Sequence, residues 1–142
     1  MMKKVLVVDD TKNIRTLLTT CLELNNFNVV TAIDGFEALN LLKKEKFDLA
    51  FLDIKLPEMS GTEVLRRMRK IDINIPVVIM TAFATVKNAV ECTKLGAVAY
   101  LQKPFTADKV KNVLKELCIS QTDNSQTIIS YLEKSKELIS SG

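Results

Sequence analysis

Two kinds of segment alternate along this chain. Short, nearly continuous apolar runs are typical of strands buried on both faces of a sheet. Each run is followed by a stretch in which apolar residues recur every three or four positions, which indicates a helix with one buried face. Strands are expected at 3–9, 27–32, 49–53, 77–81 and 97–101, and helices at about 11–25, 35–46, 61–70, 85–95 and 107–118.

The spacing of apolar residues also predicts which side of each helix faces the core. The expected inward residues are Ile14, Leu17, Leu18, Cys21 and Leu22 in the first helix, Phe36, Leu39 and Leu42 in the second, Val64, Leu65 and Met68 in the third, Val86, Ala89 and Val90 in the fourth, and Val110, Val113, Leu114, Leu117 and Cys118 in the fifth. The fourth stripe is thin, which suits a mobile element. Arg66, Arg67, Arg69 and Lys70 are expected on the outer side of the third helix.

Strict alternation of five strands and five helices predicts an α/β domain, with a parallel sheet covered on both sides. If strand two lies outside strand one, the order 2-1-3-4-5 makes strands one, three, four and five neighbours. Residues 1–119 form this domain, and the polar stretch 120–126 reads as a linker. Residues 127–142 are expected to hold an added C-terminal helix, because 127–139 is moderately amphipathic. It either packs on the domain or begins a connector to an absent output domain.

Composition narrows the class of protein. Hydrophobic residues make up 47% and charged residues 26% of 142 residues, and the net charge is only +3, which does not favour nucleic acid or membrane binding. The chain has no histidine, and Cys21, Cys92 and Cys118 are scattered, so reduced buried thiols are expected rather than a zinc site or disulfides. The N-terminal MMKKVLVVDD reads as a first strand and not as a signal peptide, which predicts a cytoplasmic protein.

Polar side chains stand where four of the predicted strands end. Asp9 and Asp10 close the first strand, Asp53 the third and Thr81 the fourth, and Lys103 follows the fifth. The carboxyl ends of parallel strands share one edge, so these groups are expected to converge. Three clustered carboxylates repel each other unless a cation intervenes, and Mg²⁺ prefers such oxygen ligands. An amine and a hydroxyl beside them suit a phosphoryl group. Taken singly, each residue has an ordinary alternative, such as a helix cap or a solvated lysine.

The motifs VLVVDD, DLAFLDIKLPEMSG, PVVIMTA and AYLQKPF, spread over residues 3 to about 119, carry a specific resemblance. The chain resembles the receiver domains of two-component response regulators, which have a flavodoxin-like, doubly wound fold. The resemblance implies that Asp53 accepts a phosphoryl group from a sensor histidine kinase or a histidine phosphotransfer protein. It also implies that Asp10, Asp53 and the backbone carbonyl of Lys55 bind Mg²⁺, and that Asp9 acts through water.

Further roles follow from the same resemblance. Thr81 and Lys103 contact the phosphoryl group, and the Lys103–Pro104 bond is cis. Tyr100 is the aromatic residue that swings inward when Thr81 is drawn to the phosphate, which alters the face made by the fourth helix, fifth strand and fifth helix. That face then binds a partner or supports a phospho-dependent homodimer. Lys55 and Phe83 resemble family positions that flank the entry of water, and we expect them to slow hydrolysis of the aspartyl phosphate.

Two other functions on a similar fold are less well supported. A Mg²⁺-dependent phosphatase with an aspartyl nucleophile has a D-x-D signature after the first strand, whereas here Asp9 and Asp10 are adjacent and Thr11 follows. A nucleotide or flavin binder needs a glycine-rich first loop, whereas DDTKN offers carboxylates. The expected function is therefore a switch that catalyses its own phosphorylation and dephosphorylation, not an enzyme with an external substrate. The residues do not identify the kinase or the output.

Overall fold

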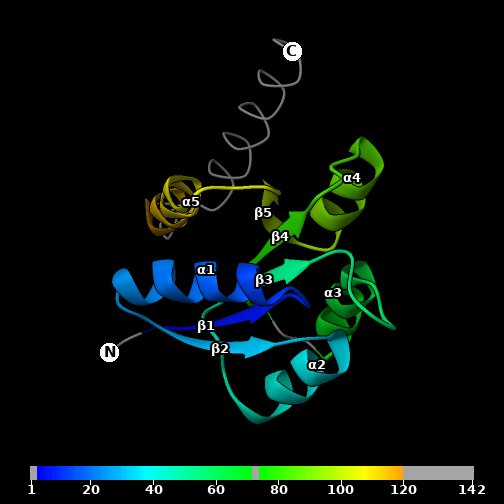
Figure 1. Cartoon of the computed structure of the whole chain (residues 1–142). Coiled ribbons are helices and arrows are strands. Elements are labelled where there is room, and N and C mark those ends of the chain that lie inside the picture. Colours follow the sequence, from blue (N-terminus) through cyan, green and yellow to red (C-terminus); the bar gives the residue numbers. More distant parts are fainter. Residues whose placement is uncertain (1–2, 72–73, 120–142) are drawn as a thin grey trace.

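A central sheet lies between two layers of helices (Figure 1). The computed structural model describes residues 3–71 and 74–119; the predicted linker and C-terminal helix fall outside them. The strands are β1 (Lys3–Val8), β2 (Phe27–Ala32), β3 (Leu49–Asp53), β4 (Val77–Thr81) and β5 (Ala97–Gln102). The helices are α1 (Lys12–Leu24), α2 (Gly35–Lys44), α3 (Gly61–Lys70), α4 (Val86–Lys94) and α5 (Ala107–Ile119).

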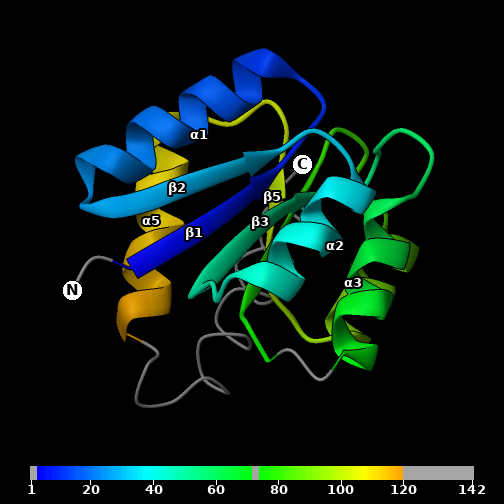
Figure 2. The ribbon, with the colours of Figure 1, turned by 90° about the horizontal axis from the view of Figure 1, so that it is seen from below.

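The sheet is parallel and its order is β2-β1-β3-β4-β5, which confirms the predicted topology. Helices α1 and α5 cover one face, and α2, α3 and α4 cover the other (Figure 2). Val8 pairs with Leu52, and Asp53 pairs with Met80 in the next strand. This register brings the carboxyl ends of β1, β3 and β4 to the same edge, where the predicted site residues stand.

Each central strand contributes side chains to two separate cores. In β1, Leu6 and Val8 pack in the cluster under α2 and α3, whereas Val5 and Val7 pack in the cluster under α1 and α5. Every residue of β3 and β4 is buried, including the carboxylate-bearing Asp53. Burial on both faces is the reason why these strands read as unbroken apolar runs rather than alternating ones.

The predicted inward faces of α1 and α3 are confirmed, with Ile14 and Leu17 only partly buried. In α5, Val110, Val113 and Leu114 are buried and Leu117 is partly buried, while the Cys118 side chain is not among those described.

The prediction for Phe36 in α2 is wrong, because its side chain is 49% exposed and Ala38 takes the inward position. The cause is close packing of the helix start, where a Cβ on Gly35 would overlap the Val64 side chain of α3.

The predicted stripe of α4 is also wrong. Val86 is 74% exposed and Val90 is 46% exposed, and Ala89 is only partly buried. The residue that α4 buries is Cys92, which joins the core under α2 and α3. Helix α4 stands beside the edge strand β5, so little of its surface meets the sheet. Cys92 and Cys21 are both free and buried, as expected.

Arg69 does not lie on the outer side of α3 as predicted. Its Nε donates to the carbonyl of Leu95 at 2.7 Å, and its two terminal nitrogens donate to the carbonyls of Ile75 at 3.1 Å and Gly96 at 3.2 Å. The guanidinium thus satisfies carbonyls at the C-terminal end of α4, where helices leave acceptors unpaired. Gly96 ends that helix with φ of +90°, a conformation that favours glycine.

Within the described residues, no helix combines the length and apolarity needed to cross a bilayer. Side chains cap the starts of α2 and α3: Asp34 Oδ1 accepts from Glu37 N at 2.8 Å, and Ser60 Oγ accepts from Glu63 N at 3.2 Å. Ser60 thereby fixes the start of α3, and the next residue, Gly61, brings the backbone of α3 against β3. The Gly61 amide donates to the carbonyl of Ile54 at 2.6 Å.

We expect Gly61→Ala to destabilise the fold, because a Cβ at this position would overlap the backbone carbonyl oxygen of Asp53. Steric overpacking of this kind typically lowers the free energy of unfolding by about 1–3 kcal/mol. Urea denaturation measures the change. Thr20→Ala, at an exposed position of α1, is the control and should stay within about 0.5 kcal/mol. Equal midpoints for the two variants would contradict the close approach.

Candidate functional site

The predicted site residues converge at the carboxyl ends of the strands. Asp9 directly follows β1 and is fully buried, and Asp53 and Thr81, which end β3 and β4, are each only 4% exposed. Asp10, beside Asp9, is exposed. Carboxylate oxygens of Asp9, Asp10 and Asp53 all lie within 4.8 Å of one another. Three strands therefore deliver three acids and a hydroxyl to one place, as the strand order requires.

Lys103 connects two of the acids. Its Nζ lies 2.6 Å from Asp9 Oδ2 and 3.0 Å from Asp53 Oδ2. Its backbone amide donates to the carbonyl of Thr81 at 2.6 Å, which fixes the chain at the end of β5. The Lys103–Pro104 peptide bond is cis, in agreement with the resemblance. The side chain is therefore held from both ends, with its charge between the two buried carboxylates.

Backbone amides hold the remaining carboxylate oxygens. Asp9 Oδ1 accepts from Thr11 N at 2.8 Å, and Asp53 Oδ1 accepts from Lys55 N at 3.2 Å. The bond from Thr11 N lies before α1, whose N-cap residue is Thr11 and which has no side-chain cap bond, so Asp9 does not cap that helix. Arg15 also contacts the site, which was not predicted from the sequence: its Nη1 donates to the backbone carbonyl of Asp9 at 2.9 Å. The one available signal was its position in the first turn of α1.

The electrostatics of the site favour an additional cation. Burial raises the pKa of Asp53, and it outweighs the opposing hydrogen bond and charge of Lys103. Burial acts to lower the pKa of Lys103, but the hydrogen bonds and charges of Asp9 and Asp53 together raise it. One ammonium charge therefore stands against three carboxylates. A hard divalent cation with oxygen ligands fits this donor set, which lies partly open to solvent at Asp10.

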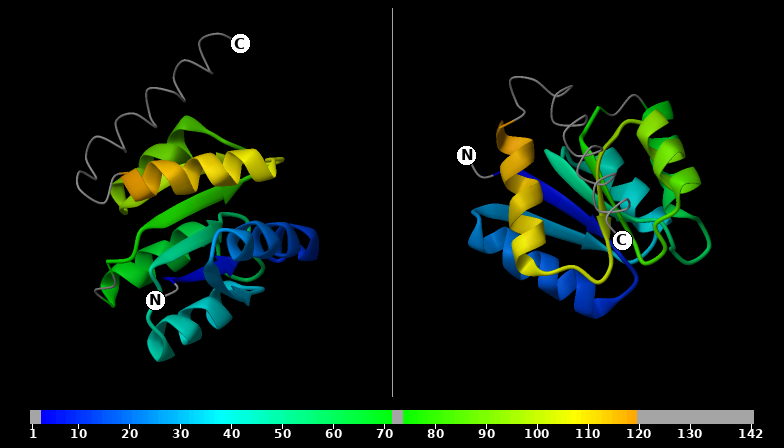
Figure 3. Two further views of the ribbon diagram at one scale, coloured as in Figure 1. Left: turned by 90° about the vertical axis from the view of Figure 1, so that its left-hand side faces the viewer. Right: turned by 90° about the horizontal axis from the view of Figure 1, so that it is seen from above.

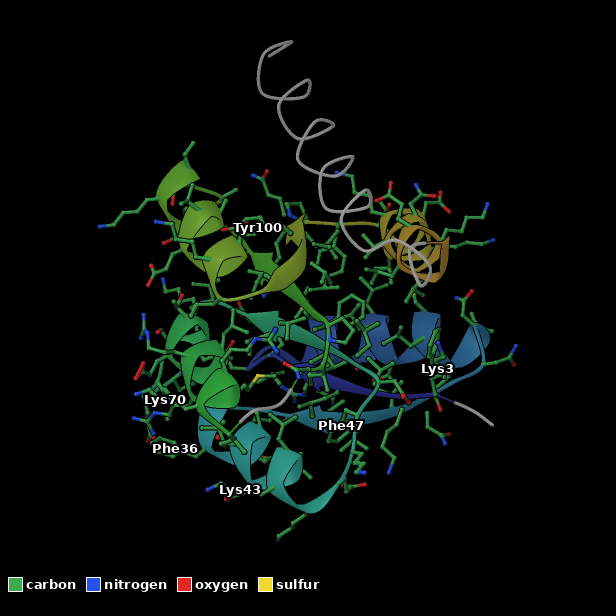
Figure 4. All side chains as sticks on the ribbon, turned by 180° about the vertical axis from the view of Figure 1, so that it is seen from behind. Lys3, Phe36, Lys43, Phe47, Lys70 and Tyr100 are labelled. Carbon is green, nitrogen blue, oxygen red and sulfur yellow. The ribbon has the colours of Figure 1, made fainter. Side chains whose placement is uncertain are left out.

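Thr81 and Tyr100 lie on the α4 side of the site. Thr81 Oγ1 accepts from the backbone amide of Phe83 at 3.1 Å. The Tyr100 ring packs in the core under α2 and α3, and Figure 4 shows Tyr100 on β5 close to α4. The pKa of the Tyr100 hydroxyl is raised to about 12, chiefly by burial and also by the charge of Cys92, while a hydrogen bond with Thr81 acts to lower it. The ring is thus directed inward in this structure.

Lys55 and Phe83 meet across the mouth of the site. They belong to the loops that follow β3 and β4, and Lys55 Nζ lies 5.8 Å from the centroid of the Phe83 ring. Phe83 is 69% exposed. Both residues line an open cavity of about 550 Å³, together with Met59, Thr81 and Asn88 among others. Each residue was a predicted site residue, but their contact could not be predicted from the sequence, because it depends on the conformation of two loops.

Comparisons with known proteins agree with this geometry. The family model described as response regulator receiver domain matches residues 5–115. Sporulation initiation phosphotransferase F of Bacillus subtilis (strain 168) is 40% identical over 116 residues, which cover 82% of this chain and 94% of that protein. Several other curated relatives are longer regulatory proteins, among them transcriptional regulators, and this chain spans only about a quarter to a half of their length.

Solved structures show the same fold. A CheY-like response regulator receiver domain protein from Methanospirillum hungatei JF-1 has a TM-score of 0.81 and 32% identity, covering 88% of this chain and all of the other. Response regulator protein TrrA from Thermotoga maritima, in complex with Mg(2+)-BeF, has a TM-score of 0.73 and 35% identity over 82% of this chain and 99% of that one. The convergent acids, the lysine and the family match together show that this chain belongs to the response regulator receiver domain family.

Proposed function

We propose that this chain accepts a phosphoryl group on Asp53 from a sensor histidine kinase or a histidine phosphotransfer protein, in a reaction that depends on Mg²⁺. One observation supports this most strongly. Asp53 is a nearly buried carboxylate between the Lys103 ammonium and the Lys55 amide, and it lies in a cluster of three acids.

The free thiols of Cys21 and Cys92 suit a reducing compartment such as the cytoplasm.

The transfer is an in-line displacement at phosphorus. A carboxylate oxygen of Asp53 forms the new O–P bond while the N–P bond to the donor imidazole breaks, and its electron pair returns to the imidazole nitrogen. Lys103 offsets the negative charge on the transferring oxygens, and it is already aligned with Asp53 at 3.0 Å. Thr81 adds a hydroxyl at the adjacent strand end. The same groups catalyse hydrolysis of the product, so the chain acts on itself and not on an external substrate.

Asp10, Asp53 and the backbone carbonyl of Lys55 are the residues we propose to hold Mg²⁺ directly. The metal supplies positive charge that stabilises both the clustered carboxylates and the phosphoryl oxygens. Asp9 is assigned a role through water by the resemblance to receiver domains; it is fully buried, whereas Asp10 is exposed.

The proposed switch passes through Thr81 and Tyr100. Thr81 Oγ1 now accepts a hydrogen bond from the Phe83 amide. Movement of the Thr81 hydroxyl toward the phosphoryl group would break this bond. It would also change the surroundings of the Tyr100 hydroxyl, since Thr81 interacts with it. Both effects reach the face formed by α4, β5 and α5, which we propose binds partners or a second phosphorylated copy.

Asp53→Asn is expected to abolish uptake of acid-labile phosphate, because the amide removes the nucleophile. The assay is incubation with acetyl phosphate and Mg²⁺, followed by intact-mass measurement of the added phosphoryl group. Asp108→Asn, at an exposed position at the start of α5, should retain full uptake. Uptake by Asp53→Asn at the level of the control would refute the assignment.

Mg²⁺ is expected to stabilise the unphosphorylated protein, by about 1.4 kcal/mol at ten times its dissociation constant. Asp10→Asn should lose this gain because a ligand is removed. The same variant should be more stable than the wild type without metal, because repulsion among the acids falls. Urea denaturation with and without Mg²⁺ measures both effects. An undiminished gain in Asp10→Asn would show that the ion binds elsewhere.

The contact between Lys55 and Phe83 bears on the lifetime of the phosphorylated state. An ammonium over an aromatic face is attractive, and the pair spans the two loops that border Asp53 and Thr81. Water that attacks the aspartyl phosphate must approach from the open side of the site. We therefore propose that this pair obstructs that approach and slows hydrolysis.

Phe83→Ala is expected to speed dephosphorylation at least about twofold, because it opens the path for water and releases the Lys55 side chain. The rate is measured by the decay of the phosphorylated mass after the donor is removed by rapid desalting. Leu24→Ala, at an equally exposed apolar residue at the end of α1, is the control. A rate in Phe83→Ala that is unchanged or lower would contradict the obstruction.

A further inference from the structure

The backbone around Asp10 is held on both sides. The carbonyl oxygen of Asp9 accepts a hydrogen bond from Arg15 Nη1 at 2.9 Å, and this oxygen belongs to the planar peptide group that joins Asp9 to Asp10. The next peptide group contributes the Thr11 amide, which donates to Asp9 Oδ1 at 2.8 Å. Both peptide groups that flank Asp10 are therefore fixed, one by the side chain of Arg15 and the other by the side chain of Asp9.

Asp10 differs from Asp9 in what holds its own side chain. Asp9 is anchored through its amide, which donates to the Ala32 carbonyl at 3.1 Å, and through its carboxylate, which accepts from Lys103 Nζ at 2.6 Å. The Asp10 side chain is exposed, and it makes no hydrogen bond or ion pair with the residues that the structure describes. The position of the Asp10 carboxylate therefore depends on its backbone, and that backbone depends in part on Arg15.

Arg15 extends from a well-packed helix. In the right-hand view of Figure 3, α1 turns back from the end of β1 and runs alongside α5 on one face of the sheet. Leu18 and Leu22 of α1 are buried in the core on that face, so the helix is a firm support. The Arg15 side chain is itself partly buried, which restricts the conformations that it can adopt. Its bond to Asp9 thus ties the loop after β1 to a packed element.

We propose that Arg15 is a positioning residue for Asp10, and that it acts through the peptide group between Asp9 and Asp10. The inference rests on the proposed role of Asp10 as a direct ligand of Mg²⁺. This ion demands near-ideal octahedral geometry, so a carboxylate that is held in place beforehand binds it at a lower entropic cost. Without the bond from Arg15, the peptide group could rotate, and the Asp10 carboxylate would spread over orientations that do not suit the ion.

Arg15 also carries a positive charge beside a cluster of three acids, and this charge has the opposite effect on metal affinity. A cation next to the site repels Mg²⁺, so removal of the charge alone would strengthen Mg²⁺ binding. Removal of the positioning bond weakens it. The direction in which the Mg²⁺ dissociation constant changes therefore separates a positioning role from that of a simple counter-charge.

Arg15→Met removes the hydrogen-bond donor and the charge but keeps an unbranched side chain. We expect its Mg²⁺ dissociation constant to rise at least about threefold, because groups that orient metal ligands contribute strongly to metal affinity. Titration calorimetry with Mg²⁺ alone measures this constant on the full chain. Lys12→Met is the matched control, since it removes the same charge from an exposed position in the same turn of α1, and it should not weaken binding. A smaller rise in Arg15→Met, no change or a fall overturns the proposal.

A second measurement separates positioning from a general loss of structure. Phosphoryl uptake from acetyl phosphate is followed over a range of Mg²⁺ concentrations. In Arg15→Met the half-saturating Mg²⁺ concentration should rise, while the rate at saturating Mg²⁺ stays within about twofold of the wild-type rate. A loss of rate that Mg²⁺ does not restore would overturn the proposal. Failure of the wild type to take up the phosphoryl group would instead contradict the proposed function, and calorimetry would still decide the role of Arg15.

Discussion

The ammonium of Lys103 between two buried carboxylates is the interaction on which this structure depends. Parallel strands end at a common edge, so the topology itself forces Asp9 and Asp53 together in a place that water barely reaches. Two buried like charges without a counter-charge would destabilise the fold. Lys103 offsets them at 2.6 and 3.0 Å, yet Asp10 leaves the site with excess negative charge. The fold therefore tolerates the buried carboxylate of Asp53, and the excess negative charge left at the site suits a further cation.

The parts of the fold that were predictable are those that the sheet dictates. Strands buried on both faces must be apolar throughout, so the polar residue that ends each run, such as Asp53 or Thr81, marks the sheet edge directly in the sequence. The wrong predictions fall where a helix packs against another helix, as in α2 and α3, or beside the edge of the sheet, as in α4. Phe36 points outward because Gly35 packs against Val64, and Arg69 turns inward because carbonyls at the end of α4 need donors. Helical periodicity carries no information about such neighbours.

The same division applies to the site. Residues at strand ends could be assigned from the sequence, because strand order alone brings them together. The engagement of both Asp9 oxygens, by Thr11 and by Lys103, depends on the conformation of the loop after β1. The contact of Lys55 with Phe83 depends on two loops at once. Side-chain geometry of this kind follows from backbone turns that leave only weak signals in residue types.

The two ends of helix α4 are held to the domain to different extents, and this affects how a movement of Thr81 would be transmitted to the helix. Its C-terminal half is fixed by buried Cys92, by the ion pair of Glu91 with Arg66, and by Arg69 at the final carbonyls. Its N-terminal half presents exposed Val86 and follows closely on Phe83, whose amide binds Thr81. If phosphorylation displaces the Thr81 hydroxyl as proposed, the change would act on the loosely held end of α4. Movement would pivot about the fixed end and would be largest near Val86.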